Sequence, residues 1–278
     1  TSGSTGLPKG VAMSHGGFSL HLEDFIAAFD YGASDRVLQF STFAFDGALE
    51  QLLPVLTVGG SVVMRGEEAW DWDRLNRCLL EEGITVADIP TAFWQQWQDR
   101  LPEGDLRLRR VTVGGEALAG DALARWRASR MGSIRLDNRY GPTEAAVSAL
   151  YRQTRPGDEA ETFVSIGHPY PGRGAAVLDG DGNAVPVGGV GELCLSGGSL
   201  ARGYLGRPGQ TAASFVPDPY GPPGSRLYRT GDRCRQMADG RVSFLGRMDG
   251  QVNLRGYRIE LGEIEAALRD CSGVTGAA

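Results

Sequence analysis

Long apolar runs are missing from this sequence of 278 residues. No run approaches the about 18 residues that a membrane-spanning helix needs, so we expect no membrane partner. Basic clusters are missing too, and a net charge of −6 argues against nucleic acid as a partner. The four cysteines show no C-x-x-C spacing, which predicts reduced thiols in a cytoplasmic protein rather than disulfides or a zinc site.

Two common catalytic signatures are also absent. The three histidines, His15, His21 and His168, have no serine or carboxylate at a spacing typical of a triad, so we interpret all three as structural. The Walker A motif requires a lysine directly after its second glycine, whereas Lys9 lies three residues after Gly6. A P-loop NTPase is therefore not predicted.

The first ten residues read Thr-Ser-Gly-Ser-Thr-Gly-Leu-Pro-Lys-Gly. Their glycines let backbone N–H groups turn inward, their hydroxyl groups donate hydrogen bonds, and Lys9 adds a positive charge. Such a segment is suited to binding a polyphosphate. A flexible Gly/Ser linker is the alternative, but linkers rarely carry Pro-Lys-Gly directly before an apolar strand.

Hydrophobic periodicity predicts alternating strands and helices in residues 1–150. Strands are expected at 37–41, 61–64, 84–89, 106–113 and 134–137, and helices at 46–58 (from leucines at helical spacing), 73–82, 91–100 and 120–130. This alternation predicts an α/β fold whose mostly parallel sheet is covered by helices. Residues 151–248 show the short strands and hairpin turns of an antiparallel, barrel-like part, and residues 249–278 begin a small third unit with a helix over 260–269.

Two later motifs are also suited to nucleotide chemistry. Residues 138–144 read Asn-Arg-Tyr-Gly-Pro-Thr-Glu, in which a ring could stack on a purine while a hydroxyl and a carboxylate hold phosphate and Mg²⁺. The alternative is a plain turn in which Thr143 caps a helix. Residues 228–232 read Tyr-Arg-Thr-Gly-Asp, whose carboxylate could accept hydrogen bonds from a ribose, although a surface turn would use the same residues.

In order and spacing, these motifs resemble those of the adenylate-forming (AMP-binding) superfamily, which includes acyl-CoA synthetases, luciferases and the adenylation domains of non-ribosomal peptide synthetases. The resemblance covers residues 1 to about 269 and implies ATP and Mg²⁺ as cofactors. It implies catalytic roles for Lys9, Thr143 and Glu144, with Glu144 as the Mg²⁺ ligand. It implies a hinge at Asp249, before a small C-terminal lid. The nucleotide-binding residues that it implies are Thr1, Ser2, Gly3, Ser4, Thr5, Gly6, Lys9, Gly115, Glu116, Asn138, Tyr140, Gly141, Thr143, Asp232 and Arg247.

Asp46, which follows Phe45, favours the amino-acid-activating branch of this superfamily. A carboxylate there could simply be a helix N-cap. The branch, however, carries an aspartate after a phenylalanine, and a desolvated substrate ammonium needs such a counter-ion. The resemblance therefore implies an adenylation domain of a non-ribosomal peptide synthetase. Motif alignment assigns its substrate pocket to Asp46, Gly47, Glu50, Asp88, Thr112, Gly114, Arg139, Val147 and Ser148.

The three acids of this pocket predict a basic substrate. One acid would bind the α-ammonium, and the other two would remain for a second cation, as in lysine, ornithine, diaminobutyrate or arginine. Arg139 leaves an alternative open. If its side chain points into the pocket, it could neutralise Glu50 or Asp88 and leave room for a neutral polar side chain.

The implied reaction converts ATP and an amino acid into aminoacyl-AMP and pyrophosphate. Transfer to the phosphopantetheine of a peptidyl carrier domain follows, with a condensation domain as a further partner. An acyl- or aryl-CoA ligase and a non-catalytic nucleotide-binding module are the alternatives. Since no strand precedes the phosphate-binding segment and the family's lysine near the C-terminus is missing, we expect the chain to be part of a larger domain and poorly active alone.

Overall fold

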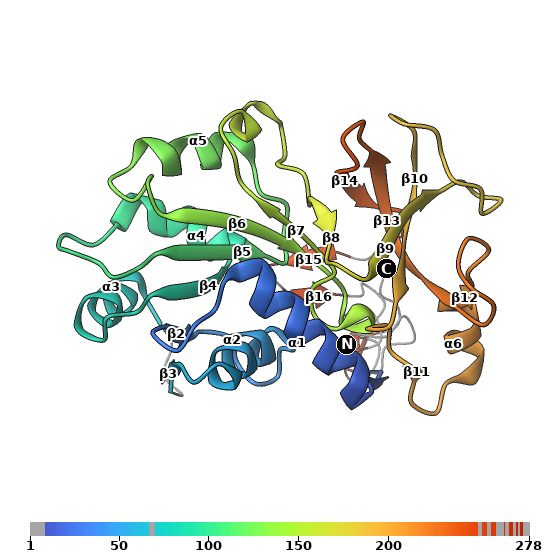
Figure 1. Ribbon diagram of the computed structural model, residues 1–278, viewed down its shortest axis with the longest axis horizontal. Helices are drawn as coiled ribbons and strands as arrows, with labels where there is room; N and C mark the ends of the chain where they lie inside the picture. Colours follow the sequence, from blue (N-terminus) through green and yellow to red (C-terminus); the bar gives the residue numbers. More distant parts are fainter. Residues whose placement is uncertain are drawn as a thin grey trace.

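The computed structural model has two parts, which lie at the left and the right of Figure 1. It describes residues 9–66, 70–249, 252–254 and 257–259, with isolated positions between 264 and 274. A seven-stranded, mostly parallel sheet with helices forms the first part, and a five-stranded antiparallel sheet forms the second. The predicted α/β fold with a following antiparallel region is therefore confirmed.

Part of the predicted nucleotide site falls beyond the part of the chain that the structure covers. Thr1, Ser2, Gly3, Ser4, Thr5 and Gly6 lie outside the described residues, as does most of the helix predicted over 260–269. Within the described ranges, no helix combines the length and the apolar character needed to cross a membrane.

The first sheet has the strand order β3-β2-β4-β5-β6-β7-β8. Its strands are β2 (Arg36–Gln39), β3 (Ser61–Met64), β4 (Val86–Pro90), β5 (Arg110–Gly114), β6 (Arg135–Tyr140), β7 (Leu150–Gln153) and β8 (His168–Pro169). The strands from β3 to β6 pair in parallel, whereas β7 and β8 pair antiparallel at one edge. The sheet thus continues past residue 150, and the antiparallel part begins at β9 (Arg173–Leu178).

Helices cover both faces of this sheet (Figure 1). They are α1 (His15–Phe29), α2 (Gly47–Thr57), α3 (Trp72–Glu81), α4 (Thr91–Trp97) and α5 (Gly120–Ala128), with short 3₁₀ turns η1 (Gln98–Arg100), η2 (Thr143–Ala145) and η3 (Asp158–Ala160). Side chains of polar residues begin two of them, because Ser14 accepts a hydrogen bond from the Gly17 N–H and Asp71 from the Arg74 N–H. The helices α3, α4 and α5 share one hydrophobic core with the sheet, and α1 and α2 pack on the other face.

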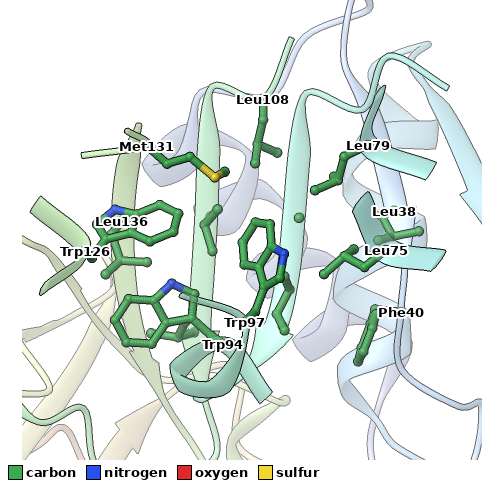
Figure 2. Packing of buried hydrophobic residues seen from close by; sticks show 14 of the residues in the cluster. Leu38, Phe40, Leu75, Leu79, Trp94, Trp97, Leu108, Trp126, Met131 and Leu136 are labelled. Carbon is green, nitrogen blue, oxygen red and sulfur yellow. The ribbon is translucent and has the colours of Figure 1, made fainter. Parts of the chain in front are cut away.

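Three tryptophans dominate the core under α3, α4 and α5. Trp94, Trp97 and Trp126 are fully buried, and Figure 2 shows them over the strands, with Leu75 and Leu79 of α3 to one side. Trp94 and Trp97 are three residues apart and therefore lie on the same face of α4. The other face carries a smaller apolar cluster of Val37, Val55 and Val86, and polar residues follow toward the ends of its strands.

Strand alternation places the predicted pocket residues on that other face. Val111 and Val113 of β5 face the tryptophan core, so Thr112 between them faces α1 and α2. The same period of two turns Asp88 of β4 and Arg139 of β6 to the α2 side of the sheet. The register of the two strands places Asp88 of β4 directly beside Thr112 of β5. The sheet thus gathers these polar side chains under α2.

The leucine spacing that predicted α2 does not mark the buried face of this helix. Leu49 and Leu56 are exposed, whereas Glu50 and Gln51 are buried. Gln51 accepts hydrogen bonds from two backbone N–H groups at the end of β2 and donates one to the Asp88 carbonyl. Hydrogen bonding to the sheet therefore decides which side of α2 faces inward.

The second part is built on an antiparallel sheet of order β12-β13-β10-β9, with β14 paired to β13. Its further strands are β10 (Val190–Gly197), β12 (Phe215–Pro217), β13 (Arg226–Gln236) and β14 (Val242–Arg247). The remaining elements are β1 (Val11–Ala12), β11 (Gly203–Tyr204), α6 (Pro208–Ser214), β15 (Val252–Leu254) and β16 (Tyr257–Ile259). Pairing of β1 with β11 attaches the start of the described chain to this part, next to Tyr204.

We expect Asp35 to make the stability of the first sheet sensitive to acid. Its carboxylate accepts hydrogen bonds from Arg109, the Gly32 N–H and Thr85 at 2.6 to 2.9 Å. Burial alone would raise the pKa of Asp35, but these bonds outweigh it and lower the pKa to about 2. The ionised carboxylate therefore stabilises the fold fully above its ordinary pKa of 3.8, and this contribution is lost as the pH falls toward about 2.

Urea unfolding of Asp35→Asn and the wild type at several pH values measures this contribution. The variant should be less stable by about 2 kcal/mol near neutral pH, and the difference should shrink between pH 4 and pH 2. The exposed Asp105→Asn is the matched control. A difference between Asp35→Asn and the wild type that stays constant down to pH 2 would contradict the role given to the ionised carboxylate.

Candidate functional site

A cavity of about 460 Å³ opens where β4, β5 and β6 end, beside the start of α2. Ligands of open parallel sheets bind beyond the carboxyl ends of the strands, as at this position. Eight predicted substrate residues line the cavity: Asp46, Gly47, Glu50, Asp88, Gly114, Arg139, Val147 and Ser148. Three predicted nucleotide residues line it as well: Gly115, Tyr140 and Gly141. Thr112 is buried and is not among the lining residues.

Asp46 precedes the first residue of α2, but it does not act as a capping residue. Its side chain makes no capping hydrogen bond of the usual kind. Burial raises the pKa of Asp46 above its ordinary value and outweighs the nearby Thr143 hydroxyl and Gly47 N–H, which act to lower it. A cation at this position would therefore stabilise the ionised carboxylate.

Arg139 connects the two other acids of the cavity. Its Nη1 donates to Glu50 Oε2, and its Nη2 donates to Asp88 Oδ2. Burial opposes the charge of the guanidinium, but Asp88 and Glu50 outweigh it and raise the pKa of Arg139. The Arg139 side chain also lies over the ring of Phe25, with 5.3 Å between the guanidinium carbon and the ring centre. Arg139 therefore points into the predicted pocket and pairs with both acids.

The two acids respond differently to this pairing. Burial alone would raise the pKa of Glu50, but Arg139, together with hydrogen bonds from His21 and Ser148, holds it below its ordinary value. Burial dominates at Asp88, whose pKa is raised despite Arg139. Glu50 is thus the firmly ionised partner of Arg139, and Asp88 is the acid that takes up a proton more readily.

A strained turn supplies the last lining residues. Ala146 and Val147 have φ angles of 59° and 67°, in the left-handed region that branched residues rarely adopt. Gly141 lies against this turn, where a Cβ atom would be 2.5 Å from the Ser148 Cα. The turn brings Val147 and Ser148 to the cavity, and such strain is common at functional sites.

The predicted ribose-binding residues form a connected group at the junction of the two parts. Asp232 accepts hydrogen bonds from the Tyr140 hydroxyl and, at 2.9 Å, from Arg247 Nη1. Arg247 Nε also donates to Asp249, the predicted hinge residue, at 2.9 Å. Burial first, and Asp232 second, raise the pKa of Tyr140 well above its ordinary value. The structure thus brings residues from β6, β13 and β14 together as the motifs predicted.

Lys9 lies beside Glu144, the residue that follows Thr143. Lys9 Nζ lies 3.6 Å from Glu144 Oε1, which also accepts a hydrogen bond of 2.7 Å from the Tyr204 hydroxyl. No cluster of three metal-binding side chains occurs among the residues that the structure describes. A single buried carboxylate still fits Mg²⁺, which proteins hold through one or two carboxylates and bound phosphate oxygens.

Two predicted nucleotide residues also make contacts within the protein. The Asn138 side chain is buried and donates a 3.2 Å hydrogen bond to the Ser165 carbonyl, away from the cavity lining. The Glu116 carbonyl accepts a 3.3 Å hydrogen bond from the Thr91 hydroxyl, which holds the loop after β5 against α4. In these contacts, both residues shape the edge of the site.

Several lining residues were not expected from the motifs. They are Phe40, Arg65, Trp70, Phe93 and Gln96. Phe93 belongs to the cavity lining and to the core alike, because it also packs against the tryptophan core, with its ring centre 4.9 Å from that of Phe40.

Comparisons with known proteins identify the family of this chain. The model of the family described as AMP-binding enzyme matches residues 1–205. The chain is 44% identical over 271 residues to phosphinothricin tripeptide synthetase PhsB of Streptomyces viridochromogenes, covering 96% of this chain and 22% of that protein. It is 42% identical over 281 residues to a dimodular nonribosomal peptide synthase of Bacillus subtilis, covering 96% of this chain and 12% of that protein. The chain thus spans less than a quarter of the length of either relative.

Solved structures match over nearly the whole chain. PA1221, an NRPS protein containing adenylation and PCP domains, is 32% identical with a TM-score of 0.91, and the match covers 100% of this chain and 48% of that chain. The Vibrio cholerae adenylation domain AlmE, in complex with glycyl-adenosine-5′-phosphate, is 28% identical with a TM-score of 0.84, covering 97% of this chain and 51% of that chain. The chain thus spans about half of each solved chain. It belongs to the AMP-binding enzyme family, and its sequence and fold group it with the adenylation domains of non-ribosomal peptide synthetases.

Proposed function

We propose that the chain provides the ATP-binding and amino-acid-binding part of an adenylation domain, which joins the two substrates into aminoacyl-AMP and releases pyrophosphate. The observation that carries this proposal is Asp46 at the cavity. Of the three acids that line the cavity, Asp46 is the one with no ion pair among the described residues, and burial raises its pKa. An α-ammonium is the group that such a carboxylate would bind.

The contact between Asp46 and Thr143 supports a specific arrangement of the substrates. An ammonium held by Asp46 would lie next to the hydroxyl group that we assign to the α-phosphate. The carboxylate of the same amino acid is two bonds away from that ammonium and would reach the phosphorus without a large movement. Catalysis would then rest mainly on positioning and on stabilising charge.

The nucleotide would extend from the cavity toward the second part. We assign the adenosine to Tyr140, Asp232 and Arg247, and the phosphates to Lys9 with the glycine-rich segment before it. Mg²⁺ bound at Glu144 would neutralise charge on the phosphates. Lys9 already lies beside Glu144, so both groups can act on the same phosphate oxygens.

The pairing of Arg139 favours a neutral polar amino acid over a basic one. With Glu50 and Asp88 both bonded to Arg139, two of the three predicted acids already have a cation. Glu50, Asp88 and Arg139 together carry one formal negative charge. The raised pKa of Asp88 reduces this charge further. The polar atoms of Glu50, Asp88 and Arg139 would instead form hydrogen bonds with an uncharged side chain.

A carrier domain is the proposed partner after adenylation. The match to a solved protein that contains adenylation and PCP domains supports transfer of the aminoacyl group to a phosphopantetheine thiol. A condensation domain would then use the thioester. The predicted hinge at Asp249 belongs to this second step, because rotation of a lid there would open the site to the thiol.

Amino-acid-dependent ATP–pyrophosphate exchange by the full-length protein tests the proposal. We expect exchange with neutral polar amino acids such as glutamine, asparagine, serine and threonine. Ornithine and lysine should be at least about tenfold poorer substrates, which corresponds to about 1.4 kcal/mol of selectivity. Exchange only with acids that lack an amino group would indicate an acyl- or aryl-CoA ligase. ATP binding without exchange for any acid would indicate a non-catalytic module.

A further inference from the structure

His21 lies behind the cavity, in the middle of α1. Its hydrogen-bond partners decide which of its ring nitrogens carries the proton. It is fully buried, with Nε2 2.7 Å from Glu50 Oε1 and Nδ1 2.7 Å from Arg173 Nη2. A guanidinium can only donate hydrogen bonds, so Nδ1 must accept. These partners assign the neutral tautomer with the proton on Nε2, which donates to Glu50.

Arg173 ties this histidine to the strained turn. It donates hydrogen bonds to the Ala145 carbonyl at 2.9 Å and the Ser148 carbonyl at 2.7 Å, on either side of the left-handed residues. The Ser148 hydroxyl donates to Glu50 Oε1 at 2.5 Å. A continuous row of hydrogen bonds therefore runs from Arg173 through His21 and Glu50 to Arg139.

Both oxygens of Glu50 are used in this row. Oε1 receives His21 and Ser148, and Oε2 receives Arg139. Rings of Phe25 and Tyr170 contact the His21 ring, with centre distances of 5.6 and 5.8 Å, so the row lies in an apolar surrounding where hydrogen bonds are strong. The Glu50 carboxylate is thus held in one orientation, facing Arg139.

We propose that His21 is a positioning residue that sets which class of side chain the pocket accepts. His21 does not line the cavity. By holding Glu50 toward Arg139, it keeps that carboxylate from turning its charge to the substrate, and the pocket accepts an uncharged side chain. This inference rests on the proposed amino acid adenylation.

Exchange kinetics of His21→Leu and His21→Gln in the full-length protein test the proposal. Leucine removes the donor, so the ratio of kcat/KM for ornithine to that for glutamine should rise about tenfold. A change of this size corresponds to the contribution of one buried hydrogen bond to a carboxylate. The glutamine amide can donate in place of Nε2, so His21→Gln should keep this ratio within about threefold of the wild type. The change should appear in KM more than in kcat, because the selectivity lies in binding.

His15→Leu is the matched control, because His15 is an exposed histidine at the start of the same helix. If His21→Leu fails to fold, His21→Met replaces it. An unchanged ratio in the leucine variant, or an equal loss of kcat/KM for ornithine and glutamine, would overturn the proposal. A shift of the same size in the glutamine variant would also overturn it, since the lost donor would not be the cause.

A crystal structure of each variant provides a readout that does not depend on activity. Glu50 should leave Arg139 and turn toward the cavity in His21→Leu, but should stay paired in His21→Gln. Glu50 unchanged in both variants would refute the positioning role, even if the wild type exchanges pyrophosphate. Failure of the wild type to exchange with any amino acid would instead refute the adenylation function, and the crystal structures would still decide whether His21 positions Glu50.

Discussion

Asp46→Asn is expected to lower kcat/KM for amino-acid-dependent pyrophosphate exchange by about 100- to 1,000-fold. The substitution keeps the size of the side chain but removes the charge that we assign to the α-ammonium of the substrate. Loss of one partner of a desolvated charge pair typically costs about 2 to 5 kcal/mol, largely because the other charge is left unpaired. ATP binding should change little, since we place the nucleotide against other residues.

Two controls separate this role from a structural one. The exposed Asp73→Asn, in the first turn of α3, should exchange like the wild type. The deamino analogue of the preferred substrate, which has no ammonium, should react equally poorly with the wild type and with Asp46→Asn. If the variant exchanges as well as the wild type with the amino acid, Asp46 is not its counter-ion and the CoA-ligase alternative gains support.

Arg139→Gln should have the second large effect, on both selectivity and stability. It leaves Glu50 and Asp88 buried without a cation, which should destabilise the fold by about 3 to 5 kcal/mol. The side-chain ammonium of ornithine or lysine could take the place of the guanidinium. We therefore expect kcat/KM for ornithine relative to glutamine to rise about a hundredfold, and ornithine to raise the Tm of the variant.

The triple variant Glu50→Gln, Asp88→Asn, Arg139→Gln is the matched control. It removes both acids together with the cation, so the gain for ornithine should disappear. A wild type that already prefers ornithine would contradict the neutral pocket, as would an Arg139→Gln variant whose preference does not change.

The motifs could be recognised from the sequence because each is a short, continuous run of residues. Tyr140, Thr143 and Glu144 lie within five residues, so their proximity follows from the chain itself. The alternation of strands and helices was equally visible, because the core residues of the first sheet follow regular periods. Asp232 and Arg247 come together across paired strands, as the motif order implied.

Contacts between distant segments could not be predicted in the same way. The strand predicted at 134–137 extends to Tyr140 as β6, because Asn138 and Arg139 are buried through polar partners rather than apolar packing. The sequence left open whether Arg139 faces the pocket, since that depends on α2 lying over β4 and β6. His21 was interpreted as structural, and no local pattern connects it to Glu50, which lies 29 residues away.

The most direct test of the account is a crystal structure of the full-length protein with a non-hydrolysable aminoacyl-adenylate analogue of its preferred amino acid. We expect the α-ammonium within hydrogen-bonding distance of Asp46, the ribose at Asp232, and Arg139 still paired with Glu50 and Asp88 beside an uncharged side chain. An ammonium bound away from Asp46, or a cationic side chain that displaces Arg139 from both acids, would contradict it.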